Sequence, residues 1–125
     1  MIKRALFKLA RNQSFSWIIG WIFTHMSFAI PVDRIAETDM FLVFHHPRPS
    51  YNLHILLVPK RKYPDLLSTP SADSGPFYTE LLQVVKQIVN QFELQEKGYR
   101  LIVNGGKYQE VPHLHFHLVS GNQQD

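Results

Sequence analysis

The sequence predicts an α+β domain in which helices cover one face of an antiparallel sheet of about five strands. Short apolar segments end at proline or glycine, and one long segment has helical spacing. The order is a helical start, three strands, a long helix and two further strands. With 125 residues, 45% of them apolar, the chain suits one domain with one core. We expect a single domain over 1–125, with a basic extension at 1–14 and a core at 15–121.

The first thirty residues are basic and then apolar. Residues 1–32 hold four basic and no acidic side chains, and residues 15–30 are strongly apolar. We interpret the apolar stretch as a helix packed on the core. The alternatives are a secretory signal peptide ending near Ala29 and a helix that contacts a membrane surface. A spanning helix is not favoured, because polar residues such as Ser16 and Thr24 leave fewer than about 20 clean apolar positions.

The rest of the chain is close to neutral, with nine basic and ten acidic residues. A duplex-DNA binder carries a basic face throughout, so we expect no duplex DNA partner. The chain has no cysteine, which excludes a disulfide scaffold, a cysteine nucleophile and a thiolate zinc site. Nothing in this composition demands an oxidising compartment, and we expect a cytoplasmic protein.

Three strands are expected in the first half of the chain, at 32–37, 40–45 and 53–58. These segments are rich in residues that suit a pleated surface, and prolines follow the second and the third. The basic cluster at 60–62 comes next. We interpret it as a solvated turn, and the alternative is a patch that steers phosphates.

One long helix and two strands are expected in the second half. Residues 64–76 are rich in Pro, Ser, Asp and Gly and predict a loop. Apolar residues at three- and four-residue steps predict an amphipathic helix over 77–92. The last two strands are expected at 99–104 and 113–120, joined by a loop with two glycines.

Three histidines alternate with apolar residues in the last predicted strand. Side chains two apart on a strand share a face and lie about 6–7 Å apart. His113, His115 and His117 would then line one face, and Leu114, Phe116 and Leu118 would face the core. Three adjacent imidazoles are costly to bury, which favours function over packing. The row suits either metal binding or catalysis in which one imidazole attacks and a neighbour moves a proton.

Three segments of the chain resemble the histidine triad (HIT) family of nucleotide-binding and nucleotide-hydrolysing proteins. VPHLHFHLV at 111–119 resembles its His-φ-His-φ-His-φ-φ signature, where φ is apolar. NLHILLVPK at 52–60 resembles its H-x-L-V-I-P-K strand, and KGYRLIVNG at 97–105 resembles its G-Y-R-x-V-x-N strand. Gln109 stands at the family's glutamine before the triad. The resemblance covers about residues 16–121.

The resemblance implies a hydrolase that acts on a nucleotide ester, anhydride or phosphoramidate. His115 corresponds to the nucleophile, which attacks the α-phosphorus and forms a nucleotidyl-imidazole intermediate. His113 corresponds to the residue whose carbonyl orients the nucleophile, and His117 to a candidate acid near the leaving atom. His54 corresponds to a fourth histidine that supports the triad. No metal or cofactor is implied. A homodimer is implied, in which the long helices and the strands at 99–104 meet across a two-fold axis.

Further residues correspond to substrate contacts. Asn104 and Gln109 correspond to polar contacts with the phosphate and the leaving group, and Phe44 to the apolar base and ribose pocket. Backbone amides around Gly105 would offer donors to phosphate oxygens. We expect the substrate to be a purine nucleoside monophosphate derivative.

Two positions depart from the family pattern. His46 stands where the family has a ribose-binding aspartate, and Glu110 stands where it has a Ser or Thr that contacts the phosphate. A carboxylate repels a phosphate, and an imidazole lacks the two-oxygen grip of an aspartate on a diol. These changes motivate the alternative of a nucleotide-binding or interaction module without turnover.

Overall fold

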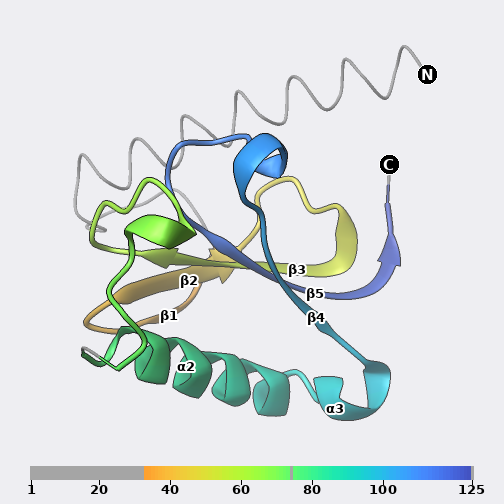
Figure 1. The fold of residues 1–125 in the computed structure, drawn as a ribbon. Coiled ribbons are helices and arrows are strands. Elements are labelled where there is room, and N and C mark those ends of the chain that lie inside the picture. The colour runs from red at the N-terminus through yellow and green to blue at the C-terminus, as the bar shows by residue number, and fades with distance from the viewer. Residues whose placement is uncertain (1–32, 74, 125) are drawn as a thin grey trace.

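The computed structural model describes residues 33–73 and 75–124, and they form one five-stranded antiparallel sheet covered by a helix (Figure 1). The strand order is β1-β2-β3-β5-β4. The strands are β1 (Arg34–Glu37), β2 (Phe41–His45), β3 (Tyr51–Pro59), β4 (Arg100–Val103) and β5 (Phe116–Gln123). The predicted α+β class is confirmed. The helix expected near the N-terminus lies outside the described residues.

The helix α2 (Phe77–Gln91) lies along one face of the sheet and is followed by the short α3 (Leu94–Lys97) (Figure 1). Two 3₁₀ turns, η1 (Leu66–Ser68) and η2 (Gly106–Tyr108), lie in the loops. Glu80 on α2 accepts hydrogen bonds from the Thr38 hydroxyl at 2.7 Å and the Met40 amide at 2.8 Å. These bonds join the helix to the turn between β1 and β2.

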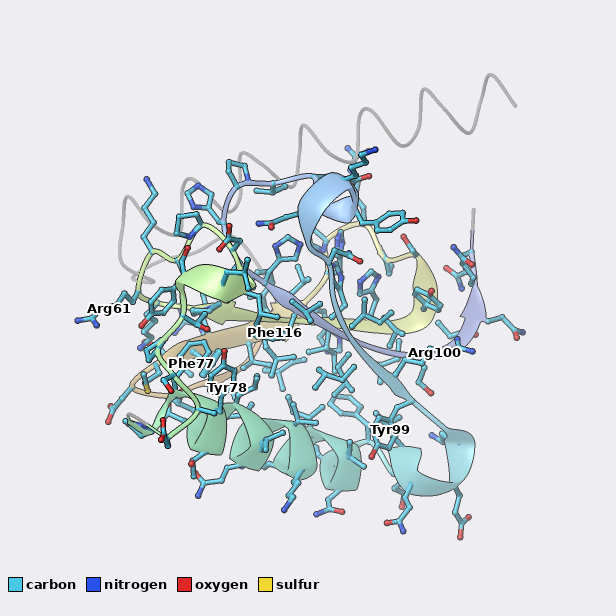
Figure 2. All side chains as sticks on the ribbon, in the orientation of Figure 1. Arg61, Phe77, Tyr78, Tyr99, Arg100 and Phe116 are labelled. Carbon is cyan, nitrogen blue, oxygen red and sulfur yellow. The ribbon has the colours of Figure 1, made fainter. Side chains whose placement is uncertain are left out.

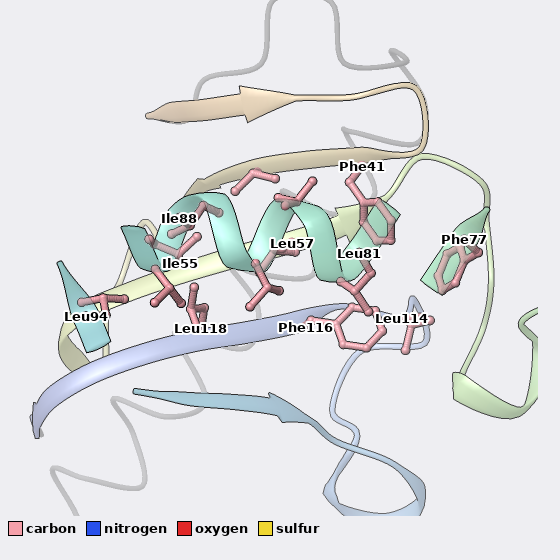
Figure 3. Packing of buried hydrophobic residues seen from close by; sticks show 14 of the residues in the cluster. Phe41, Ile55, Leu57, Phe77, Leu81, Ile88, Leu94, Leu114, Phe116 and Leu118 are labelled. Atoms are coloured by element: carbon pink, nitrogen blue, oxygen red, sulfur yellow. The ribbon is translucent and has the colours of Figure 1, made fainter. Parts of the chain in front are cut away.

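The core lies between α2 and the sheet (Figure 3). The predicted core-facing residues Leu114, Phe116 and Leu118 are all buried in this cluster. Figure 2 shows Phe77 at the start of α2 beside the sheet, and its ring lies 5.1 Å from that of Phe41. Alternate residues of β3 and β5 therefore face away from α2, and these positions include the histidines.

The last predicted strand begins later than expected. Residues 113–115 precede β5, which starts at Phe116 and continues to Gln123. Pro112 has no amide to donate to a ladder. The amide of Leu114 bonds instead to the Tyr63 carbonyl at 2.8 Å, outside the sheet. The prediction of a strand over 113–120 is therefore wrong for its first three residues.

The helices of the described residues are too short or too polar to cross a membrane. The cytoplasmic location expected from the sequence stays a prediction.

Candidate active site

His54 and His117 are brought together by the pairing of β3 with β5. His54 lies opposite Val119, and Leu56 lies opposite His117. The two histidines are therefore diagonal neighbours on the face away from α2. Their rings meet through a hydrogen bond of 2.8 Å between His54 Nε2 and His117 Nδ1.

A backbone amide sets the direction of this hydrogen bond. The Ser50 amide donates to His54 Nδ1 at 3.0 Å, and an amide cannot accept. In the neutral ring the proton of His54 is therefore on Nε2, which donates to Nδ1 of His117. His117 in turn carries its proton on Nε2. This nitrogen is buried and has no hydrogen-bond partner among the described residues.

His117 is held neutral by its surroundings. Burial, followed by the nearby rings of His115 and His54, lowers the pKa of His117 to about 3. The site therefore offers an uncharged N–H donor on the face away from α2.

His115 has the opposite tautomer. Its Nδ1 lies 2.8 Å from the carbonyl oxygen of His113, and a carbonyl can only accept. The proton is therefore on Nδ1, and Nε2 carries a lone pair. Burial lowers the pKa of His115, against the opposing effects of the His113 carbonyl and the Glu110 carboxylate. A neutral imidazole with its lone pair on Nε2 is the form required of a nucleophile that attacks through this nitrogen.

His115 and His117 are edge-on neighbours, with ring centroids 4.9 Å apart. His115 is 7% exposed. The Nε2 lone pair of His115 and the N–H donor of His117 thus belong to adjacent rings. His113 contributes its carbonyl. Burial, followed by the charge of Lys62, lowers the pKa of the His113 ring.

His46 extends this cluster beyond the triad. Its ring lies 4.4 Å from that of His54, and its amide donates to the His54 carbonyl at 2.8 Å. The Arg48 amide donates to His46 Nδ1 at 2.9 Å, so the neutral ring carries its proton on Nε2. An aspartate at this position would accept hydrogen bonds, whereas the neutral His46 ring presents an N–H donor at Nε2.

Phe44 lies in the same layer as the triad. It is opposite Leu56 on β3, which is opposite His117 on β5. Residues opposite one another in a ladder share a face, so Phe44 and His117 face the same side of the sheet. Phe44 is fully buried.

The residues predicted to contact the phosphate are Gln109, Asn104 and Gly105, and they do not share one environment. Gln109 donates its side-chain amide to the carbonyls of Pro64 at 2.6 Å and Val111 at 3.0 Å. Asn104 and Gly105 lie in the turn after β4. Within the part of the chain that the structure describes, no hydrogen bond joins Asn104 or Gly105 to the histidines.

The three residues of the basic cluster at 60–62 have different surroundings. Lys60 forms an ion pair of 2.6 Å with Glu37, and Arg61 projects outward (Figure 2). The charge of Lys62 contributes to the lowered pKa of the His113 ring. Over residues 33–73 and 75–124, no group of three or more His, Asp or Glu side chains has the arrangement of a metal site.

Sequence reasoning missed the backbone groups that orient the site. These are the amides of Ser50 and Arg48 and the carbonyls of Tyr63 and Pro64. A side-chain pattern does not show them. The one available signal is Pro112, whose missing amide interrupts a strand ladder.

Comparison with known proteins places this geometry in a family. The family model of the HIT domain matches residues 27–124. The chain belongs to the HIT family. An uncharacterized HIT-like protein of Helicobacter pylori (strain ATCC 700392 / 26695) is 35% identical over 96 residues, which cover 75% of this chain and 88% of the relative. The purine nucleoside phosphoramidase of Escherichia coli (strain K12) is 33% identical over 94 residues, which cover 74% of this chain and 78% of the relative.

Solved structures of the HIT family share the fold. A histidine triad protein from Clostridium difficile superposes with a TM-score of 0.67 at 32% identity, covering 77% of this chain and 84% of that one. A HIT family hydrolase from Legionella pneumophila Philadelphia 1 gives the same TM-score and identity over 75% of this chain and 85% of that one. At family level these relatives support a nucleotide-binding hydrolase.

Proposed function

We propose that this chain is a HIT-type hydrolase or transferase that cleaves a nucleotide phosphoramidate, ester or anhydride at the α-phosphate. His115 is the nucleophile, and the reaction passes through a nucleotidyl-histidine intermediate. The observation that carries the proposal is the hydrogen bond from His115 Nδ1 to the His113 carbonyl, because it leaves the lone pair on Nε2. The similarity to a purine nucleoside phosphoramidase supports a purine nucleoside monophosphate derivative as substrate.

The first half of the reaction transfers the nucleotidyl group to the protein. Nε2 of His115 attacks the α-phosphorus, and the bond from phosphorus to the leaving nitrogen or oxygen breaks. A bound phosphate brings negative charge, which favours protonation of neighbouring imidazoles, so the hydrogen-bonded pair of His54 and His117 takes up one proton from solvent as the substrate binds. The leaving group departs with the bonding electron pair and receives this proton from His117.

The second half releases the nucleotide. A water molecule attacks the phosphorus and gives a proton to His117, and the bond between phosphorus and His115 Nε2 breaks. The electron pair returns to Nε2, and the product is a nucleoside monophosphate. Phe44 contributes an apolar wall on the same face.

A homodimer is part of the proposal. β4 pairs only with β5 in the described sheet, which leaves its other edge without a strand. Tyr99, Leu101 and Val103 on or beside this strand are exposed, and so is Leu82 on α2. An apolar sheet edge of this kind favours pairing with another chain. Sedimentation equilibrium tests this, and a monomer at micromolar concentration would contradict it.

The test compares hydrolysis of adenosine 5′-phosphoramidate by the wild type, His115→Ala and His45→Ala. His45 is a matched control, because its ring packs edge-on against Phe92 at 5.9 Å, on the α2 side. We expect His115→Ala to lose at least about 10³-fold in kcat, as expected for loss of a nucleophile, and His45→Ala to stay close to wild type.

Binding of adenosine monophosphate, measured by calorimetry, separates the two candidate functions. Binding by the wild type with no turnover above that of His115→Ala would contradict the enzyme. It would favour the binding module suggested by the carboxylate of Glu110, whose charge reaches His115. The absence of both binding and turnover would contradict both functions.

A further inference from the structure

The segment that carries the nucleophile lies outside the sheet. β5 begins at Phe116, so His113, whose carbonyl orients His115, precedes the part of the chain that pairs with β3 and β4. This segment is held by the turn at 63–64 instead. The Leu114 amide donates to the Tyr63 carbonyl at 2.8 Å, and the Gln109 side chain donates to the Pro64 carbonyl at 2.6 Å.

Both amide hydrogens of Gln109 are engaged in this connection. A glutamine side chain has two N–H donors. One donates to Pro64 and the other to the carbonyl of Val111, at 3.0 Å, within the segment itself. In this geometry neither hydrogen is available to a phosphate oxygen. The arrangement differs from the phosphate contact that the resemblance implies for Gln109.

Buried side chains lie at or beside both carbonyls that Gln109 joins. Tyr63 is buried, and its ring packs edge-on against Phe77 at 5.4 Å. Val111 and Leu114 are also buried, at 2% and 1% exposure. Gln109 therefore connects the turn that holds the buried Tyr63 to the buried Val111, two residues before His113. A change in this connection moves the His113 carbonyl, and the 2.8 Å hydrogen bond passes the movement to the ring of His115.

We propose that Gln109 is a positioning residue for the nucleophile. Its amide holds the 109–115 segment at a fixed distance from the turn at 63–64, and this sets where His115 Nε2 lies relative to His117. The kinetic consequence rests on the proposed function. A misplacement of about 1 Å at a reacting atom costs on the order of 10²-fold in rate.

The experiment uses Gln109→Met, which keeps the length of the side chain and removes both donors, and Gln109→Glu, which sets a carboxylate against two carbonyls. Gln83→Met, at an exposed position on α2, is the matched control. The first measurement is amide hydrogen exchange. We expect the Leu114 amide to exchange at least about tenfold faster in both Gln109 variants, while the Leu118 amide in β5 keeps its wild-type rate.

The second measurement separates positioning from direct binding. We expect kcat to fall about ten- to hundredfold in Gln109→Met, more in Gln109→Glu, and the affinity for adenosine monophosphate to change less than about threefold. A wild-type exchange rate at Leu114 would overturn the proposal, and so would a tenfold loss of affinity with kcat unchanged. Because exchange needs no turnover, a protein without hydrolase activity would contradict the proposed function and still leave the exchange result decisive for Gln109.

Discussion

His115 and His117 are both histidines with neighbouring rings, yet the fold places the proton on a different nitrogen in each ring. His117 lies in β5, between Leu56 of β3 and Ile102 of β4. His115 lies in the segment before the strand. A carbonyl places the proton of His115 on Nδ1, whereas an amide, acting through His54, places that of His117 on Nε2. One ring therefore presents a lone pair and the other an N–H. Backbone groups, and not the side chains alone, therefore determine which nitrogen of each histidine ring carries the proton.

Apart from that of His115→Ala, the largest effect is expected from removing either of the two histidines that lie in the strands. We expect His117→Ala to lower kcat about 10²- to 10⁴-fold, because it removes the proton donor. His54→Ala should lower kcat to a similar extent, because His54 sets the tautomer of His117. The double variant should be little worse than His117→Ala alone, since the two rings act as one unit. Steady-state kinetics on all three variants checks this, and additive losses would show that the rings act independently.

The burial of His117 makes the stability of the protein depend on pH. The pKa of His117 is lowered from 6.5 to about 3, chiefly by burial. Between these pH values the unfolded chain binds a proton that the folded chain does not. The free energy of unfolding therefore falls as the pH falls, by up to about 1.4 kcal/mol per pH unit from this group. The lowered pKa of His115 acts in the same direction.

Urea unfolding at pH 7.5, 6 and 5 measures this dependence in the wild type and in His117→Gln. The variant should lose less stability than the wild type as the pH is lowered. Parallel losses in the two proteins would mean that His117 is not held neutral by burial.

A smaller effect is expected from removing the Ser50 amide, which sets the direction of the hydrogen bond between His54 and His117. Ser50→Pro removes the N–H that donates to His54 Nδ1, and Ser50→Ala keeps it. We expect Ser50→Pro to lower kcat about tenfold, because His54 and His117 then populate both tautomers. Ser50→Ala should stay within about twofold of the wild type. Equal kinetics of the two variants would contradict the role of the amide.

The sequence predicted the fold well because its signals are local. Apolar spacing placed the helix at 77–92, and α2 spans Phe77–Gln91. Alternation placed Leu114, Phe116 and Leu118 in the core, where they are found. The start of β5 was missed, because it depends on Pro112 and on a hydrogen bond from Leu114 to the distant Tyr63.

The site could be predicted only as a set of side chains. The histidines follow from a repeating pattern. The tautomers follow from Ser50 and His113, and the role of Gln109 from carbonyls of Pro64 and Val111. These partners are backbone atoms present in every residue, so no residue type marks them. Only the three-dimensional arrangement shows which of them contact the ring and amide nitrogens.

Nitrogen-15 NMR measures the tautomers of the His115 and His117 rings. Long-range proton–nitrogen correlation spectra of the histidine rings at pH 7.5 distinguish a protonated Nδ1 from a protonated Nε2. We expect the proton of His115 on Nδ1 and that of His117 on Nε2. A proton on Nε2 of His115, or on Nδ1 of His117, would contradict this expectation.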